Sequence, residues 1–207
     1  MISIIDHGQG NIGSLTNALR LLKFDFNVVT NYEQGRASKE LKGFILPGVG
    51  AFNTAMRSMR RKGLDKLVLD YHRKNVKGLG ICLGMQLLFE GSEEGGYSED
   101  GLKIFNGKIK KLNEAKDVVP NIGWVKTLAT QSTKVNAFSQ YLDGSFYYIH
   151  SYGLIDSQNK SIIAEILHGE DQVAAAVYDG IVLGVQFHPE KSQDNGLSLL
   201  LNYFKEQ

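Results

Sequence analysis

The stretch "KGLGICLGMQLLFEGS", residues 77–92, indicates the architecture of this 207-residue chain. "KGLGIC" has the short apolar composition of a buried strand, and "LGMQLLFEGS" begins a helix with no loop between the two. A strand that passes at once into a helix is typical of parallel sheets covered by helices. Gly80 and Gly84 flank Cys82 at this junction, as the sharp turn of a nucleophile elbow requires.

The first half of the chain repeats this alternation of strand and helix. Short apolar runs at 2–6, 26–31 and 43–48 predict three further strands. Residues 12–23 carry a helical stripe of Ile12, Leu15, Leu19 and Leu22, and residues 51–75 carry helical spacing twice, with a break at Gly63. We expect an α/β fold with a mostly parallel central sheet flanked by helices.

The second half has a different pattern, in which short strands are joined by polar loops. Segments 102–112, 144–155 and 161–169 are predicted strands, and 172–187 is a predicted hairpin with Asp179-Gly180 at its turn. A closing helix over 196–207 carries a stripe of Leu197, Leu200, Leu201 and Phe204. Added antiparallel strands and the lack of a repeat or proline-rich linker favour a single domain over residues 1–207.

Composition narrows the class of protein. A net charge of +1 and a pI near 7.8 argue against a nucleic-acid partner, which usually requires a concentrated basic excess. With only one cysteine, no intrachain disulfide can form. No apolar run approaches the roughly 20 residues that cross a bilayer, and the N-terminus lacks a signal-peptide core. We therefore expect a cytoplasmic protein with no membrane partner and no bound metal.

Cys82 is the strongest candidate for chemistry. The turn lifts its sulfur clear of the sheet, and the N-terminus of the following helix favours a thiolate. A buried structural cysteine is the alternative, because free cysteines are usually buried. A base is therefore needed to support the nucleophile interpretation.

"VQFHPEKS" supplies a candidate base in His188, with Glu190 two residues later. Pro189 disfavours helix at His188, and residues i and i+2 of an extended segment point to the same side. Such a carboxylate can orient the imidazole and stabilise its protonated form. An exposed His–Glu pair is the alternative interpretation.

Acyl transfer also needs hydrogen-bond donors for an oxyanion. The amide after the nucleophile, at Leu83, is one candidate. "LPGVGAF" offers the other, because Gly48 and Gly50 free the backbone so that the Val49 N–H can face the site.

Taken together, these motifs resemble the class I (triad) glutamine amidotransferases. "LPGVGAF", "GICLGMQLLFEGSEEG", "HSY" and "GVQFHPEKS" occur in the family's order, and "IID-G-GN" fits at the N-terminus. The resemblance covers essentially the whole chain. Within the family, the sequence is most similar to the glutaminase subunits of imidazole glycerol phosphate synthase.

The resemblance implies a Cys82–His188–Glu190 triad that hydrolyses glutamine through a γ-glutamyl thioester, without a cofactor. Ammonia would then pass to a (β/α)₈-barrel cyclase subunit, which makes imidazole glycerol phosphate and AICAR from PRFAR in histidine biosynthesis. The implied oxyanion donors are Val49 and Leu83. The implied substrate-binding residues are Gly48, Gly50, Gln86, His150, Ser151 and Tyr152. The implied interface residues are Asn11, Pro120, Gly123, Trp124 and Lys191, with Trp124 expected in a glycine-containing loop.

Two departures from the family pattern leave an alternative open. His7 stands where an aromatic residue is frequent, and "PNIGW" replaces a partner-facing "PHMGW". A paralogous glutaminase subunit that feeds a related barrel synthase for surface-sugar amidation is therefore the alternative within the family. A cysteine peptidase or esterase and a non-catalytic binding module are the alternatives outside it.

Three other features receive no functional role. Gly8, Gly10 and Gly13 have the G-x-G-x-x-G spacing of a dinucleotide loop, but the second predicted strand ends at Asn31 without the ribose-binding acid. We interpret this spacing as a strand-to-helix turn. His72 and His168 are interpreted as histidines in polar surface positions.

Overall fold

The computed structural model describes residues 1–38, 40–96, 98–130, 138–155 and 158–205. Its main sheet has nine strands in the order β2-β1-β3-β4-β12-β11-β10-β7-β8. The strands from β2 to β12 in this order pair in parallel. They are β1 (Ile2–Ile5), β2 (Phe26–Val29), β3 (Gly43–Leu46), β4 (Gly78–Ile81) and β12 (Val182–Val185).

The remaining four strands extend the sheet in antiparallel pairs. They are β7 (Asn121–Ala129), β8 (Gly144–His150), β10 (Ile162–His168) and β11 (Asp171–Tyr178). A smaller sheet joins β5 (Gly91–Ser92), β6 (Lys108–Lys111) and β9 (Tyr152–Gly153). The expected fold class, a parallel sheet with antiparallel strands added in the second half, is confirmed.

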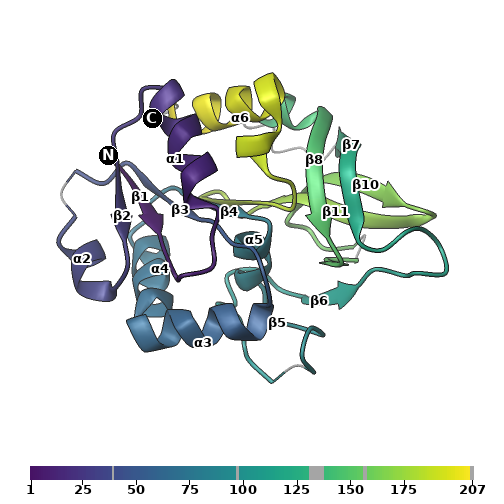
Figure 1. The fold of residues 1–207 in the computed structure, drawn as a ribbon, viewed down its shortest axis with the longest axis horizontal. Helices are drawn as coiled ribbons and strands as arrows, with labels where there is room; N and C mark the ends of the chain where they lie inside the picture. The colour runs from purple at the N-terminus through teal and green to yellow at the C-terminus, as the bar shows by residue number, and fades with distance from the viewer. Residues whose placement is uncertain (39, 97, 131–137, 156–157, 206–207) are drawn as a thin grey trace.

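Helices cover both faces of the parallel region (Figure 1). One face carries α1 (Ile12–Leu21) and α6 (Gln193–Lys205), and the other carries α3 (Phe52–Lys62), α4 (Leu64–Arg73) and α5 (Leu83–Leu87). The short helix α2 (Tyr32–Arg36) follows β2, and 3₁₀ turns lie at Ser139–Leu142 and Pro189–Lys191. None of the helices in the described part of the chain is long and apolar enough to cross a membrane.

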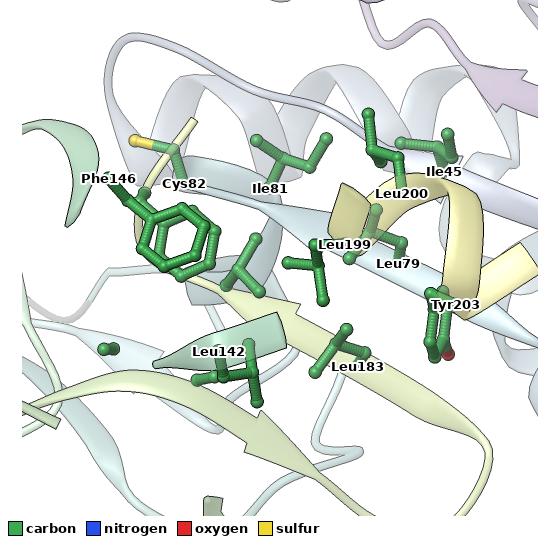
Figure 2. Packing of buried hydrophobic residues seen from close by; sticks show 14 of the residues in the cluster. Ile45, Leu79, Ile81, Cys82, Leu142, Phe146, Leu183, Leu199, Leu200 and Tyr203 are labelled. Carbon is green, nitrogen blue, oxygen red and sulfur yellow. The ribbon is translucent and has the colours of Figure 1, made fainter. Parts of the chain in front are cut away.

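Two hydrophobic clusters lie on opposite faces of the sheet because successive strand residues point to opposite sides. In β3, Ile45 belongs to the cluster beneath α1 and α6, while Phe44 and Leu46 belong to the cluster beneath α3 and α4. Figure 2 shows the first cluster, in which Leu199 and Leu200 of α6 lie over the strand residues. Cys82 lies at the end of the same cluster.

The helix predictions hold with one correction. Leu15 and Leu19 of α1 are buried, with Ile12 and Leu22 half-buried against the same cluster. Gly63 separates α3 from α4 with a left-handed φ of 67°, as expected for a break. In α6 the predicted stripe is wrong at Leu201, which is only partly buried, whereas Leu197 is half-buried against the same cluster. The buried positions are Gly196, Leu199, Leu200, Tyr203 and Phe204.

The glycine-spaced segment Gly8–Gly13 forms the turn from β1 into α1. Gly8 has a φ of 96°, a backbone conformation that glycine adopts readily. Asn11 caps α1 by accepting a hydrogen bond from the Ser14 N–H at 3.4 Å. This turn places the end of β1 beside the loop that follows β3, because the Val49 N–H donates to the Gln9 carbonyl.

Candidate active site

Cys82 occupies a strained turn between β4 and α5. Its φ of 52° and ψ of −110° are unusual for a residue with a side chain. A Cβ atom at Gly84 would lie 1.8 Å from the Leu46 carbonyl oxygen, and one at Gly80 would lie 2.9 Å from the Gly84 carbonyl oxygen. The flanking glycines are therefore required by close backbone contacts, as the elbow interpretation expects.

The Cys82 side chain is almost completely buried, with 6% exposed. Its Sγ lies 3.8 Å from the Ile149 carbonyl oxygen, which can accept a hydrogen bond from the thiol. Nε2 of Gln186 lies 3.7 Å from the same sulfur and can donate to it. The sulfur thus contacts an acceptor from β8 and a donor from the segment after β12.

His188 and Glu190 form a buried pair behind Cys82. Nδ1 of His188 lies 2.8 Å from Oε1 of Glu190, with 2% and 3% of the two side chains exposed. Burial acts to lower the pKa of His188, but the adjacent Cys82 and Glu190 outweigh it and raise the pKa to about 10. The histidine therefore favours its protonated form when the sulfur and the carboxylate are ionised.

Backbone contacts fix this pair against β8. The His188 N–H donates to the Tyr147 carbonyl at 2.9 Å, and the Ser192 hydroxyl donates to the His188 carbonyl at 2.6 Å. Within the described residues, Nε2 of His188 and Oε2 of Glu190 are buried without a hydrogen-bond partner. A buried polar atom without a partner is costly, and a catalytic role is one reason for a protein to keep it.

A cavity of about 340 Å³ opens beside the Cys82 sulfur. It brings together the end of β3, the elbow, the segment after β5 and the β7–β8 pair. Eight predicted site residues line it together with the predicted interface residue Pro120: Val49, Gly50, Cys82, Leu83, Gln86, His150, Ser151 and Tyr152. Gly48 does not line this cavity; it packs against Leu83, where an added Cβ would lie 2.9 Å from the leucine Cβ.

His150 is held as a neutral imidazole in the wall of the cavity. Its Nδ1 donates to the Tyr152 carbonyl at 2.9 Å, so Nε2 accepts from Nδ2 of Asn121 at 3.1 Å. Burial lowers its pKa to about 4. His150 is therefore uncharged at neutral pH and presents a polar but neutral side chain to a ligand.

Glu94 and Gln186 are candidate site residues that the sequence reasoning missed. Glu94 lines the cavity and accepts a hydrogen bond from the Phe52 N–H at 2.7 Å, at the start of α3. It belongs to the motif "FEGSEEG", in which the sequence alone does not distinguish the two adjacent glutamates. Gln186 lies two residues before His188, so the spacing that paired His188 with Glu190 could also have indicated it.

Val49 is placed at the cavity, but its N–H is used elsewhere. It donates to the Gln9 carbonyl at 3.1 Å. In this conformation the Val49 N–H is therefore not free to bind an oxyanion. Leu83 is the first residue of α5, directly after the elbow.

Two of the predicted interface residues, Gly123 and Trp124, lie on β7, and Pro120 directly precedes it. Lys191 lies in the 3₁₀ turn Pro189–Lys191, and Asn11 caps α1. Trp124 is on strand β7, not in a loop as its glycine neighbour suggested, and 49% of it is exposed. It pairs with Tyr147, whose ring lies 6.2 Å from the indole and 5.7 Å from the Lys191 ammonium. Ile122 and Ile149 pair on the same face and also line the cavity.

The surface interpretation is wrong for His168 and holds for His72. His168 is 2% exposed, because alternation along β10 places it on the buried side with Ile166. His72 is only partly exposed, and its Nε2 lies 2.7 Å from the Asp179 carboxylate. Neither lies in the wall of the candidate site.

Comparison with known proteins identifies the class to which this fold and site belong. The family described as "Glutamine amidotransferase class-I" matches residues 3–206. The chain belongs to this family of enzymes.

Particular relatives narrow the comparison. The chain is 40% identical to "Imidazole glycerol phosphate synthase subunit HisH" of Oceanobacillus iheyensis, over 98% of both chains. It is 36% identical to the protein of the same name from Prochlorococcus marinus, over 99% of this chain and 97% of that one.

Solved structures share the fold at lower identity. "Structure of PurLQS from Thermotoga maritima" matches with a TM-score of 0.70 and 17% identity, over 99% of this chain and 97% of that chain. The glutaminase domain of Trypanosoma brucei CTPS with bound acivicin matches with a TM-score of 0.64 and 15% identity, over 100% of this chain and 94% of that one.

Proposed function

We propose that this chain is the glutaminase subunit of an imidazole glycerol phosphate synthase. It hydrolyses glutamine to glutamate and ammonia, and the ammonia passes to a (β/α)₈-barrel cyclase subunit that converts PRFAR into imidazole glycerol phosphate and AICAR. The full-length similarity to the HisH subunits supports this assignment. The observation that carries the chemistry is the buried His188–Glu190 pair behind a cysteine at a glycine-flanked elbow.

Acylation begins when the Cys82 thiolate attacks the side-chain amide carbon of glutamine. His188 receives the thiol proton on Nε2 and delivers it to the leaving nitrogen, so that ammonia departs and a γ-glutamyl thioester remains. Glu190 holds the Nδ1–H of His188 and stabilises the imidazolium. Water, deprotonated by the same histidine, then attacks the thioester and releases glutamate.

The cavity has the polarity that glutamine requires. Glu94 offers a carboxylate for the α-ammonium group of the substrate, and His150 offers a neutral polar wall. The described hydrogen bonds of Gln86 both use Nε2, so its Oε1 is the atom we assign to the substrate. We keep Gly50, Ser151 and Tyr152 as substrate-binding residues because they line the same cavity.

We assign the cyclase-binding surface to the exposed face of β7 and β8 that carries Ile122, Trp124 and Ile149. This face adjoins the cavity, because two of these residues line it, so ammonia released there would have a short route to the bound partner. Asn11, Pro120, Gly123 and Lys191 remain predicted interface residues. We also place the complex in the cytoplasm, because the single cysteine is assigned to chemistry and not to a disulfide.

Replacing Cys82 by Ala tests the proposal. Glutamine-dependent synthesis by the complex should be lost, whereas synthesis from added ammonium salt should remain, because the acceptor site lies on the other chain. A glutamine-like chloroketone should label the peptide that contains Cys82 in the wild-type protein. Retained glutaminase activity in Cys82→Ala, or labelling elsewhere, would contradict the assignment.

Purification from the native cell tests the identity of the partner. We expect mass spectrometry to identify the histidine-pathway cyclase. Recovery of a different barrel synthase would instead support the paralogous role in surface-sugar amidation.

A further inference from the structure

Gln186 is a buried polar side chain that none of the proposed steps uses. It is 0% exposed and follows β12 directly. Its Nε2 lies 3.7 Å from the Cys82 sulfur, within the range of hydrogen bonds to sulfur. A polar side chain that is buried beside a nucleophile has a strong influence on it, because little water screens the interaction.

The orientation of the Gln186 carboxamide follows from the groups around it. The Tyr152 carbonyl can only accept a hydrogen bond, so Gln86 must present Nε2 to it, at 2.8 Å. The same Nε2 donates to Oε1 of Gln186 at 3.0 Å. The NH₂ end of Gln186 is therefore the end that faces Cys82.

We propose that Gln186 is a catalytic residue that donates a hydrogen bond to the Cys82 sulfur and stabilises its thiolate, and that Gln86 is the residue that positions it. This inference rests on the proposed role of Cys82 as the nucleophile. A donor beside an anion favours the ionised form. The Ile149 carbonyl, 3.8 Å from the sulfur, acts in the opposite direction because it can accept a hydrogen bond only from the neutral thiol.

The hydrogen-bonded chain also connects the substrate cavity to the nucleophile. Gln86 lines the cavity and donates a hydrogen bond to Gln186, and Gln186 in turn donates to the Cys82 sulfur. A substrate that contacts Gln86 therefore touches the group that orients the thiolate donor. We expect loss of the donor to reduce kcat for glutamine more than it raises KM.

Alkylation by iodoacetamide measures the thiolate directly, because Cys82 is the chain's single cysteine. Gln186→Met keeps the side-chain length and removes the donor. The pH of half-maximal alkylation rate should rise by about one unit, and the rate at neutral pH should fall about tenfold, as expected for loss of a hydrogen bond to a charged group. Gln186→Glu, which places a carboxylate there, should slow alkylation further. Gln172→Met, at an exposed position on β11, is the control and should match the wild type.

An unchanged alkylation profile in folded Gln186→Met would overturn the inference. If that variant does not fold, Gln86→Met provides the test. Its profile should shift in the same direction by a smaller amount, and a wild-type profile would overturn the inference equally. Alkylation needs no glutamine, so this result is read separately from the glutaminase activity of Cys82→Ala, which tests the proposed function itself.

Discussion

At the scale of single residues, the charge state of His188 depends on opposing effects. Burial disfavours the imidazolium, whereas Cys82 and Glu190 favour it strongly enough to raise the pKa to about 10. Glu190 acts on the imidazole through a 2.8 Å contact and does not line the substrate cavity. Its contribution should therefore appear in the chemical step rather than in substrate binding.

Glu190→Gln should lower kcat by about 10²–10⁴-fold, the range for a disabled acid–base group, with little change in KM for glutamine. Steady-state glutamate release by the complex measures both constants. Glu170→Gln, at an exposed carboxylate, is the control and should keep wild-type values. A Glu190→Gln variant with normal kcat would mean that another group orients His188.

Spacing along the chain explains which site residues could be predicted. Glycines around Cys82 and the short separation of His188 and Glu190 are local signals, and the structure places these residues together. The His188–Glu190 pair forms across the 3₁₀ turn Pro189–Lys191, however, and not along the extended segment that was expected. Glu94 reaches the cavity only because it binds the start of α3, a contact between segments 42 residues apart. No local pattern encodes such a contact. His168 could have been predicted as buried from its alternation with Ile166.

At the scale of elements, the elbow depends on the close approach of α5 to the end of β3. An Ala at position 84 would place its Cβ 1.8 Å from a backbone oxygen, which has little freedom to move. Gly84→Ala should therefore reduce the free energy of unfolding by about 3 kcal/mol or more. This corresponds to a fall in Tm of about 6–12 °C for a chain of this size.

Gly13→Ala is the matched control for this prediction. A Cβ at Gly13 meets no atom within 4 Å, and the residue lies in the first turn of α1. Its Tm should stay equal or rise slightly, because alanine favours helix. Thermal unfolding followed by circular dichroism compares the two variants, and equal Tm values would contradict the steric explanation of the elbow.

The β7–β8 pair presents apolar side chains on the face that a globular domain normally makes polar. Ile122 and Trp124 are 57% and 49% exposed. Since large aromatics are often interface anchors, Trp124→Ala should weaken cyclase binding by about 30-fold or more. Leu21→Ala, an exposed leucine on α1, should leave affinity unchanged.

Fluorescence gives a second measurement, because Trp124 is the chain's single tryptophan. Its emission should shift when the cyclase binds. An unchanged spectrum, with binding confirmed by calorimetry, would remove Trp124 from the interface.

The same face explains why β7 was missed as a strand. Ile122, Trp124 and Leu128 are on its exposed side, whereas the other side has Val125 among small or polar residues, so the alternation does not show the core-facing pattern of a half-buried strand. The five-residue helix α2 was missed for a different reason, since it is too short to carry a periodic stripe. Strands β1, β3, β4 and β12 were predictable because they are short, apolar and buried on both faces.

At the scale of the whole molecule, the parallel sheet brings the site residues together at the carboxyl ends of its strands. Gln9, Val49, Cys82 and His188 all follow the carboxyl ends of parallel strands, which meet at the same edge of a sheet. Since both hydrophobic clusters pack against this sheet, we infer that residues 1–207 form a single domain. The site therefore depends on contacts between segments that are distant in sequence.

One of these contacts suggests that the isolated chain is a poor glutaminase. The Val49 N–H donates to the Gln9 carbonyl at 3.1 Å, so the proposed oxyanion donor is occupied. The peptide before Val49 must turn for this N–H to reach the oxyanion, and Gly48 permits such a turn at low conformational cost. Binding of the cyclase and its acceptor substrate would favour the turned state by their differential affinity for it.

We therefore expect glutamate release to rise at least about a hundredfold when the cyclase and its acceptor substrate are added, because one oxyanion donor contributes about 10²–10³ in rate. Alkylation of Cys82 by iodoacetamide forms no oxyanion, so in the free chain it should already proceed at the rate of a reactive thiolate. Comparing the two rates separates the effect of the oxyanion donor from the reactivity of the nucleophile. Equal glutamate release in the free and bound states would show that both oxyanion donors are already in place in the free chain. The hydrogen bond from the Val49 N–H to Gln9 would then not regulate the glutaminase activity.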